Sequence, residues 1–301
     1  MSPGTHSKVS AATHSWLSPV PLFFVFLWST GFIVAKLGLP YAPPMTFLIL
    51  RCLGVLAVLL PVVLVFRAPW PRGGQMLHVM VAGLLLQAGY LGGVWAAIKL
   101  GMPAGLAALI VGMQPILTAA AAPLIGERVR PRQWLGLALG LAGVALVVLA
   151  KLHLPGLTLA GIGLCVFALL CITAGTMYQK RYCPAFDLRT GTVIQFAATV
   201  LALLPLAILL EGMDLRLSAV TWSADFIFAW LWSIFALSIG AIFLLFTLIR
   251  RSQATEVTSL LYLTPPTTAI MAWLMFGESL GALALAGMAV AVLGVVFVVK
   301  K

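Results

Sequence analysis

The chain has 301 residues, of which 62% are hydrophobic and only 8% are charged, and its formal net charge is +11. Its mean hydropathy of +1.13 is far from that of soluble domains, which are roughly half apolar and about a quarter charged. This composition excludes a soluble globular protein and predicts an integral membrane protein.

Apolar runs long enough to cross a bilayer follow one another along the chain. A hydrocarbon core about 30 Å thick requires about 20 apolar residues in a helix. The runs are continuously apolar, whereas outer-membrane strands alternate in polarity, so we expect an all-α membrane protein. The ten expected transmembrane helices cover 19–36, 44–66, 75–98, 104–125, 132–150, 158–179, 190–210, 226–248, 254–276 and 280–299.

Positive charge is distributed unevenly between the loops on the two sides of these spans. One side carries 13 Lys and Arg residues, which are Lys8, Arg67, Arg72, Arg128, Arg130, Arg132, Lys180, Arg181, Arg189, Arg250, Arg251, Lys300 and Lys301. The other side carries four, which are Lys36, Lys99, Lys151 and Arg216. The positive-inside rule therefore predicts that both termini, including a tail at 1–18, are cytoplasmic. Topology explains the basic surplus, and we expect no nucleic-acid partner.

The sequence lacks the patterns that mark metal sites, nucleotide sites and hydrolase centres. Its cysteines, Cys52, Cys165, Cys171 and Cys183, do not have metal-ligand spacing. There is no Walker loop, no H-E-x-x-H and no G-x-S-x-G motif, and no histidine lies in the middle of a span. We therefore expect neither an enzyme nor a bound cofactor or metal.

The chain also repeats itself. A shift of 151 residues matches Pro115 with Pro266, Gly126 with Gly277, Glu127 with Glu278 and Gly143 with Gly294, and a shift of 144 matches Gly31 with Gly175, Lys36 with Lys180 and Pro61 with Pro205. This pattern predicts two five-helix units, 19–150 and 151–301. Because five is odd, the second unit is inverted, which is typical of alternating-access carriers with a site near the midplane. The alternative is that duplication merely enlarged a helical scaffold.

Several short motifs carry a resemblance to a known family. They are FLWSTGF at 26–32, Arg51 in the second span, PLIGERV at 123–129 and MFGESL at 275–280. With the two five-helix repeats, they resemble the EamA-type carriers of the drug/metabolite transporter superfamily. The resemblance implies a central cavity surrounded by helices 1–4 and 6–9, with the fifth and tenth at the side. It also implies transport of a small organic solute, mostly outward, without identifying that solute.

The fifth and tenth spans carry small residues at the spacing that lets helix backbones approach closely. Gly136 and Gly140 form a G-x-x-x-G pair, and Gly287, Ala291 and Gly294 are similarly arranged. We expect these spans to be packing elements. A homodimer contact through the same faces is an open alternative.

Polar residues concentrate in the remaining spans, where hydrocarbon should force them towards a cavity or towards one another. For each Ser or Thr, the alternative is a hydrogen bond to a carbonyl one turn back in its own helix. The candidate pathway residues are Trp28, Ser29, Thr30, Arg51, Gln87, Tyr90, Trp95, Gln114, Thr173, Gln195, Tyr262 and Thr264.

Matched prolines and glutamates mark the fourth and ninth spans. Pro115 and Pro266 are expected to kink their helices, either as paired gates or as static bends that shape the cavity. Glu127 and Glu278 end the same spans at opposite faces. We expect each to bond the start of the next helix, where a negative charge is favourable.

Arg51 lies about 10 Å into the second span, at about 1.5 Å per residue. A charge at that depth must find partners or water, and the 144-residue shift matches it with another polar residue, Gln195. It either attracts an anionic substrate or braces broken-helix carbonyls as a strut. We favour the strut, because the family resemblance places an Arg here in carriers with different substrates.

Taken together, these features predict a secondary transporter of the inner membrane that exports a small organic solute by alternating access. A passive channel or a non-transport scaffold or receptor is the alternative. No Asp or Glu lies deep within a span, so energy coupling is either gradient-driven facilitation or proton antiport through a boundary group. Aromatic residues and amides without a buried acid favour a neutral, zwitterionic or partly apolar solute.

Overall fold

The computed structural model describes residues 19–121, 131–151, 158–183, 186–241, 244, 263–278 and 281–299. In these ranges every regular element is a helix, and η denotes a π-helix. The elements of the first half are α1 (Pro19–Gly38), α2 (Pro44–Val65), α3 (Gly74–Gly83), η1 (Leu84–Gly89), α4 (Tyr90–Lys99), α5 (Ala104–Val111), α6 (Gln114–Ala121) and α7 (Pro131–Lys151). Those of the second half are α8 (Leu159–Tyr182), α9 (Leu188–Glu211), α10 (Ala224–Trp232), η3 (Ser233–Gly240), α13 (Thr264–Phe276) and α14 (Ala282–Val299).

The described helices lie within or close to the ranges that the apolar runs predict. The third expected span is a continuous helix built from α3, η1 and α4, whereas the fourth is divided into α5 and α6 at Gly112 and Met113. Among the described residues, four helices are long and apolar enough to cross a membrane, and they are Pro44–Val65, Gly74–Lys99, Leu159–Tyr182 and Leu188–Glu211.

Polar side chains set several of the helix starts. Thr158 Oγ1 accepts a 3.0 Å hydrogen bond from the amide of Gly161 and so begins α8. Ser223 Oγ accepts a 3.1 Å bond from the amide of Phe226 at the start of α10. These are N-caps, which satisfy amides that have no partner in the first turn of a helix.

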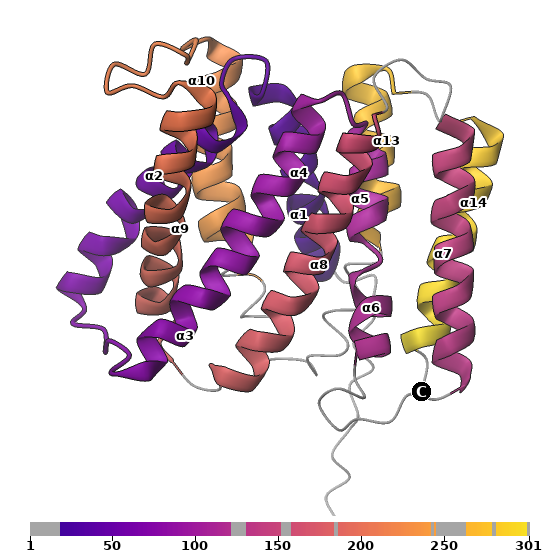
Figure 1. Ribbon diagram of the computed structural model, residues 1–301, viewed down its shortest axis with the longest axis horizontal. Coiled ribbons are helices and arrows are strands. Elements are labelled where there is room, and N and C mark those ends of the chain that lie inside the picture. The colour runs from indigo at the N-terminus through magenta and orange to yellow at the C-terminus, as the bar shows by residue number, and fades with distance from the viewer. Residues whose placement is uncertain are drawn as a thin grey trace, which may run out of the picture.

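Helices at corresponding places in the two halves pack against each other. The pairs are α2 with α9, α5 with α13, and α7 with α14. Figure 1 shows α7 and α14 side by side at one edge of the bundle, beyond α5 and α6. This agrees with the expectation that the fifth and tenth spans pack at the side.

The α7–α14 pair is held together through its small residues. A Cβ atom added to Gly143 would lie 2.4 Å from the amide nitrogen of Ala291, and one added to Gly294 would lie 2.5 Å from that of Gly140. The two backbones therefore touch at these positions. The small-residue faces that left a homodimer open as an alternative are covered within the chain.

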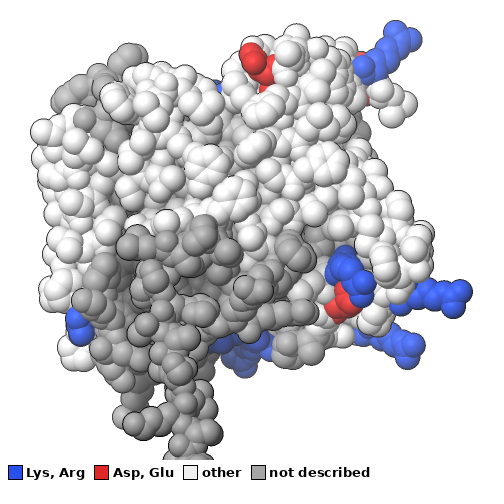
Figure 2. Space-filling model, turned by 180° about the vertical axis from the view of Figure 1, so that it is seen from behind, with Lys and Arg blue, Asp and Glu red and all other residues white. Residues whose placement is uncertain are grey.

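The two ends of the bundle differ in charge. One end carries the start of α2, the start of α5 and the ends of α9 and α13. It holds the carboxylates of Glu211, Asp214, Asp225 and Glu278 together with Lys36, Lys99 and Arg216, and we call it the acidic end. The other end carries Arg67, Arg72, Arg181 and Arg189, and we call it the basic end. Figure 2 shows Lys and Arg side chains mainly at the basic end.

Large apolar side chains cover the sides of the bundle between these ends. Leu64, Leu201 and Leu209 are 62%, 68% and 79% exposed. In water such a surface would be unfavourable, but hydrocarbon chains solvate it without penalty. The exposed surface therefore matches a lipid environment.

Candidate functional site

Arg51 connects the two halves of the chain. Its side chain is only 7% exposed, and its Nε donates a 3.0 Å hydrogen bond to Ser238 Oγ on η3. Ser238 Oγ in turn donates a 2.8 Å bond to the carbonyl oxygen of Ser233. The guanidinium on α2 is thus tied to a hydroxyl that is itself fixed on the π-helix.

A π-helix occurs at the same place in each half. η1 covers Leu84–Gly89 and η3 covers Ser233–Gly240, and the 151-residue shift places Gln87 on Ser238 and Gly89 on Gly240. π-helices are rare and frequently lie at functional sites. Hydrophobic periodicity predicted neither the two π-helices nor the role of Ser238. The one available signal was the 151-residue shift, which pairs Ser238 with Gln87 when it is extended to the third span.

By the repeat shifts, Gln195 and Gln87 are the counterparts of Arg51 and Ser238. The main chain of Gln195 lies against Gly83, because a Cβ atom added there would be 2.6 Å from Gln195 Cα. Gln195 is buried, and its Nε2 donates a 3.1 Å hydrogen bond to Gln179 Oε1 on α8. Gln87 Oε1 is buried without a hydrogen-bond partner, which leaves an acceptor available on η1.

Gln114 links the fourth and sixth expected spans. Its Nε2 donates a 3.0 Å hydrogen bond to Thr176 Oγ1, which donates a 2.7 Å bond to the carbonyl oxygen of Ile172. Thr173, three residues before Thr176, is buried and donates a 2.7 Å bond to the carbonyl oxygen of Leu169. Thr173 therefore bonds within its own helix, whereas Gln114 bonds between helices.

On α1, the hydroxyl of Ser29 also bonds within its own helix, whereas that of Thr30 bonds a second helix as well. Ser29 Oγ is 2.7 Å from the carbonyl oxygen of Val25, to which it donates within the helix. Thr30 Oγ1 donates to the carbonyl of Leu27 at 2.6 Å and also accepts a 2.9 Å bond from Trp232 Nε1. Thr30 thus links α1 to α10, in the eighth expected span. The half-buried Trp28 lies on the same helix.

Two of the aromatic candidates, Trp95 and Tyr90, are buried in the bundle. Trp95 is 2% exposed, and its ring packs edge-on against that of Phe47 with centroids 4.6 Å apart. This places Trp95 in the apolar core of the bundle. Tyr90 is 9% exposed and belongs to the same apolar core.

The matched prolines lie at helix starts rather than in helix interiors. Pro115 is the second residue of α6, and Pro266 is the third residue of α13. In the first turn a proline replaces an amide that has no helical partner, so it is well tolerated there. In the fourth span the break occurs at Gly112 and Met113, before Pro115. Next to Pro266, Thr264 Oγ1 is buried without a partner.

Glu278 bonds the start of a helix, but not of the next one. Its Oε1 accepts a 3.1 Å bond from the amide of Ala104 and its Oε2 a 3.5 Å bond from Gly105, both at the start of α5. It also forms an ion pair with Lys36. The matched Glu127 and the pathway candidate Tyr262 lie outside the described residues.

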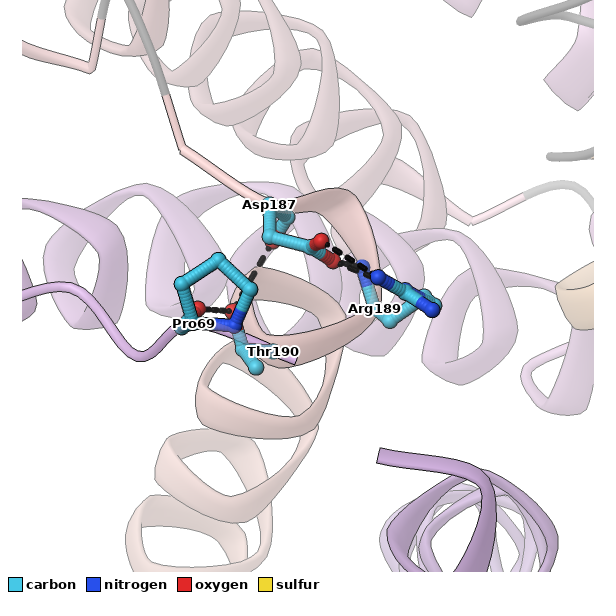
Figure 3. A network of polar contacts seen from close by, with 4 residues as sticks. All are labelled: Pro69, Asp187, Arg189 and Thr190. Atoms are coloured by element: carbon cyan, nitrogen blue, oxygen red, sulfur yellow. Dashed lines mark hydrogen bonds and ion pairs between the residues drawn. The ribbon is translucent and has the colours of Figure 1, made fainter. Parts of the chain in front are cut away.

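A charged cluster at the basic end fixes the start of α9 against the α2–α3 loop (Figure 3). Asp187 Oδ1 accepts a 2.9 Å bond from the amide of Arg189, whose guanidinium forms a 2.8 Å ion pair with Asp187 Oδ2. Thr190 Oγ1 donates to the carbonyl oxygens of Pro69 and Asp187, at 2.9 and 3.0 Å. The hydrogen bond from the Arg189 side chain lowers the pKa of Asp187 below its usual range.

The polar groups of the candidate positions are mostly neutral. Among the described residues, no group of three or more His, Cys, Asp or Glu side chains lies close enough together to hold a metal ion. The candidate positions instead offer amides, hydroxyls and one guanidinium. Hydrogen bonds from such groups can orient a polar solute in a binding site.

Several curated proteins are similar to this chain over most of its length. A "Probable amino-acid metabolite efflux pump" of Salmonella typhimurium is 29% identical over 271 residues, covering 88% of this chain and 89% of that protein. An "Uncharacterized inner membrane transporter YedA" of Escherichia coli is 27% identical, covering 93% and 90%. A "Probable terminal-alkyne amino-acid exporter" of Streptantibioticus cattleyicolor is 27% identical, covering 66% and 65%.

A solved crystal structure shares the fold, with a TM-score of 0.65, 19% sequence identity and coverage of 93% of this chain and 95% of that one. The family described as "EamA-like transporter family" matches the chain twice, at residues 20–149 and 159–300. These two matches include almost all of the described helices. The chain therefore belongs to the EamA-like transporter family.

Proposed function

We propose that this chain is a multi-pass inner-membrane carrier that exports a small organic solute by alternating access. The observation that carries the proposal is the family match in each half, at 20–149 and at 159–300. Relatives named as an inner membrane transporter, an efflux pump and an exporter support the location and the direction.

The mechanism follows from two halves that cross the membrane in opposite senses. The proposed halves are 19–150 and 151–301, each with five spans, with the tail 1–18 and both termini in the cytoplasm. The pairing of α2 with α9, α5 with α13 and α7 with α14 supports this arrangement. The matched π-helices η1 and η3 support it as well. Inverted halves can exchange conformations and so open a shared cavity to either side.

The proposed substrate is an amino acid or a related neutral or zwitterionic metabolite. Two relatives bear names that specify amino-acid compounds, and the candidate pathway offers amides and hydroxyls. Gln87 Oε1 is an acceptor without a protein partner, so a donor such as a substrate ammonium group can satisfy it. Arg51 is assigned as a strut, because its Nε is engaged by Ser238.

Counterflow in proteoliposomes tests the function. Vesicles are loaded with a pool of amino acids and related metabolites, and the uptake of each labelled member is measured against its external concentration. A carrier gives saturable uptake that depends on the internal pool. We expect Gln87→Leu and Gln114→Leu to abolish that exchange, whereas Gly163→Ala, which adds a methyl group with nothing within 4 Å, leaves it unchanged.

Each alternative gives a different result in the same vesicles. A passive channel gives flux that rises linearly with concentration and ignores the internal pool. A scaffold or receptor gives no flux for any compound, although the protein is folded. Exchange that is indifferent to pH and to collapse of the proton gradient assigns facilitation, and exchange driven by an imposed gradient assigns proton antiport.

A further inference from the structure

Carboxylates of the second half hold the first half at the acidic end. Glu211 accepts 2.8 Å bonds from the amides of Met45 and Thr46 at the start of α2. Asp225 Oδ2 accepts a 3.0 Å bond from the hydroxyl of Tyr41. Both contacts use neutral donors, so they resemble helix caps and ordinary loop bonds.

Glu278 differs from these two residues because its main partner is a cation. The ammonium group of Lys36, in the last turn of α1, forms an ion pair with Glu278 Oε1 and lies 4.8 Å from the ring centroid of Phe276. The carboxylate also accepts the amides of Ala104 and Gly105 on α5. One side chain thus joins the ends of α1 and α13 to the start of α5.

The surroundings make this contact stronger than a surface ion pair. The side chain of Glu278 is 10% exposed and that of Lys36 is 31% exposed. A partly buried carboxylate that also receives helix amides is stabilised by the helix dipole as well as by its cation. The three helices that it joins also pack against one another. Breaking the pair therefore frees the ends of helices that are expected to surround the central cavity.

The duplication supplies the same pair of residue types twice. The 144-residue shift matches Lys36 with Lys180, and the 151-residue shift matches Glu278 with Glu127. In an inverted duplication, matched residues belong to opposite ends of the molecule. Each end is therefore assigned one Lys and one Glu. A contact that opens alternately at the two ends requires such a pair at each of them.

We propose that Lys36 and Glu278, with the start of α5, form the latch that keeps the acidic end closed and that opens once in each transport cycle. This inference rests on the proposed alternating access. Release of Lys36 lets α1 and α13 separate at this end. The Glu211 and Asp225 contacts persist in both states, because their partners are α2 and the loop that precedes it.

Distance measurements between two spin labels test the latch without requiring transport. Labels at Pro40→Cys, just after α1, and at Leu274→Cys on α13 report on the two helices that the latch joins, and both side chains are exposed. We expect Lys36→Met and Glu278→Gln to raise the long-distance population at least about fivefold, a typical scale for such couplings. Lys36→Arg retains the charge and should restore the short distance.

Glu211→Gln is the matched control, because it weakens a carboxylate cap at the same end without touching an ion pair that bridges α1 and α13. An unchanged distance distribution in both latch variants, with thermal midpoints equal to that of the parent protein, overturns the latch and leaves a static brace. An equal shift in Glu211→Gln also overturns it, since the effect would then not be specific. Absence of exchange by the parent protein refutes the proposed transport. The distance measurement does not depend on exchange, so it still shows whether the Lys36–Glu278 pair holds the acidic end closed.

Discussion

Arg51 and Ser238 are joined by a 3.0 Å hydrogen bond across the two halves of the chain, and the repeat shifts match them with Gln195 and Gln87. Ser238 and Gln87 lie on the two matched π-helices, but their hydrogen bonding differs. On one, the hydroxyl of Ser238 accepts a hydrogen bond from the guanidinium Nε of Arg51. On the other, Gln87 Oε1 has no partner. The two halves have thus kept polar residues at these matched positions, but the hydrogen bonds of those residues differ.

The Arg51–Ser238 bond should contribute to stability as a strut. Removing the hydroxyl in Ser238→Ala leaves a buried charged donor without its acceptor, which costs about 1–3 kcal/mol. We expect a lower thermal midpoint and a lower abundance in the membrane. Thr199→Val is the control, because the Thr199 hydroxyl is equally buried but bonds within its own helix, to the carbonyl of Gln195. An effect no larger than that of the control argues against a strut.

Gln87 should separate transport from stability. Because its buried oxygen has no partner, Gln87→Leu removes an unsatisfied group, and we expect the thermal midpoint to stay equal or rise. Exchange should nevertheless fall, because the substrate loses an acceptor. Gln195→Leu is the matched control, since it breaks the 3.1 Å bond to Gln179 and should lower the midpoint. A marked loss of stability in Gln87→Leu would contradict a binding role.

The sequence predicted much of the fold, because bilayer thickness imposes a length and a polarity on every span. The shifts of 144 and 151 residues also predicted which helices correspond. Single-residue fates were harder to predict. Trp95 is an aromatic candidate on an expected cavity helix, yet it packs against Phe47 in the core. Whether an aromatic ring faces a cavity or a neighbouring ring depends on helix rotation, which a nearly uniform apolar run does not encode.

The site was predictable in part. Arg51 stood out because an isolated charge in a span demands a partner, but the identity of that partner, Ser238, depends on a π-helix that hydrophobic periodicity cannot reveal. Glu278 was expected at the start of the next helix, and it binds α5 of the other half instead. Its carboxylate follows the rule that acids favour helix starts. The choice among several helix starts is a matter of tertiary packing.

Asp187 should make the basic end sensitive to acid. Its pKa lies below the usual value, chiefly because of the hydrogen bond from Arg189. A lowered folded-state pKa means that the charged form stabilises the fold above the unfolded pKa of about 3.9, and that this stability is lost as the pH falls through the folded pKa. Asp187→Asn retains an N-cap but not the ion pair.

The corresponding measurement compares thermal midpoints of the parent protein and Asp187→Asn between about pH 7 and pH 3. We expect the parent protein to be more stable at neutral pH and the difference to shrink towards zero in acid. A difference that is constant with pH would show that the ion pair with Arg189 does not contribute. Since Thr190 also bonds Pro69, the α2–α3 loop should loosen together with the start of α9.

The α7–α14 contact should determine stability rather than oligomeric state. Valine at position 143 places its Cβ 2.4 Å from the amide nitrogen of Ala291 and 2.5 Å from the carbonyl oxygen of Gly287, so the two backbones must separate. Overpacking of this kind typically costs about 1–3 kcal/mol. We therefore expect Gly143→Val to lower the thermal midpoint, whereas Gly163→Val on α8, with nothing within 4 Å of an added Cβ, should have a small effect.

The same variants test the remaining alternative for these small residues. If they formed a contact between two copies of the chain, Gly143→Val would change the mass of the particle measured by light scattering in nanodiscs and leave the isolated fold intact. Because Gly143, Gly287 and Gly294 are already covered by the opposite helix of the same chain, we expect the mass to be unchanged and the midpoint to fall. Close backbone approach in lipid is favourable wherever small residues align, and here one chain supplies both faces.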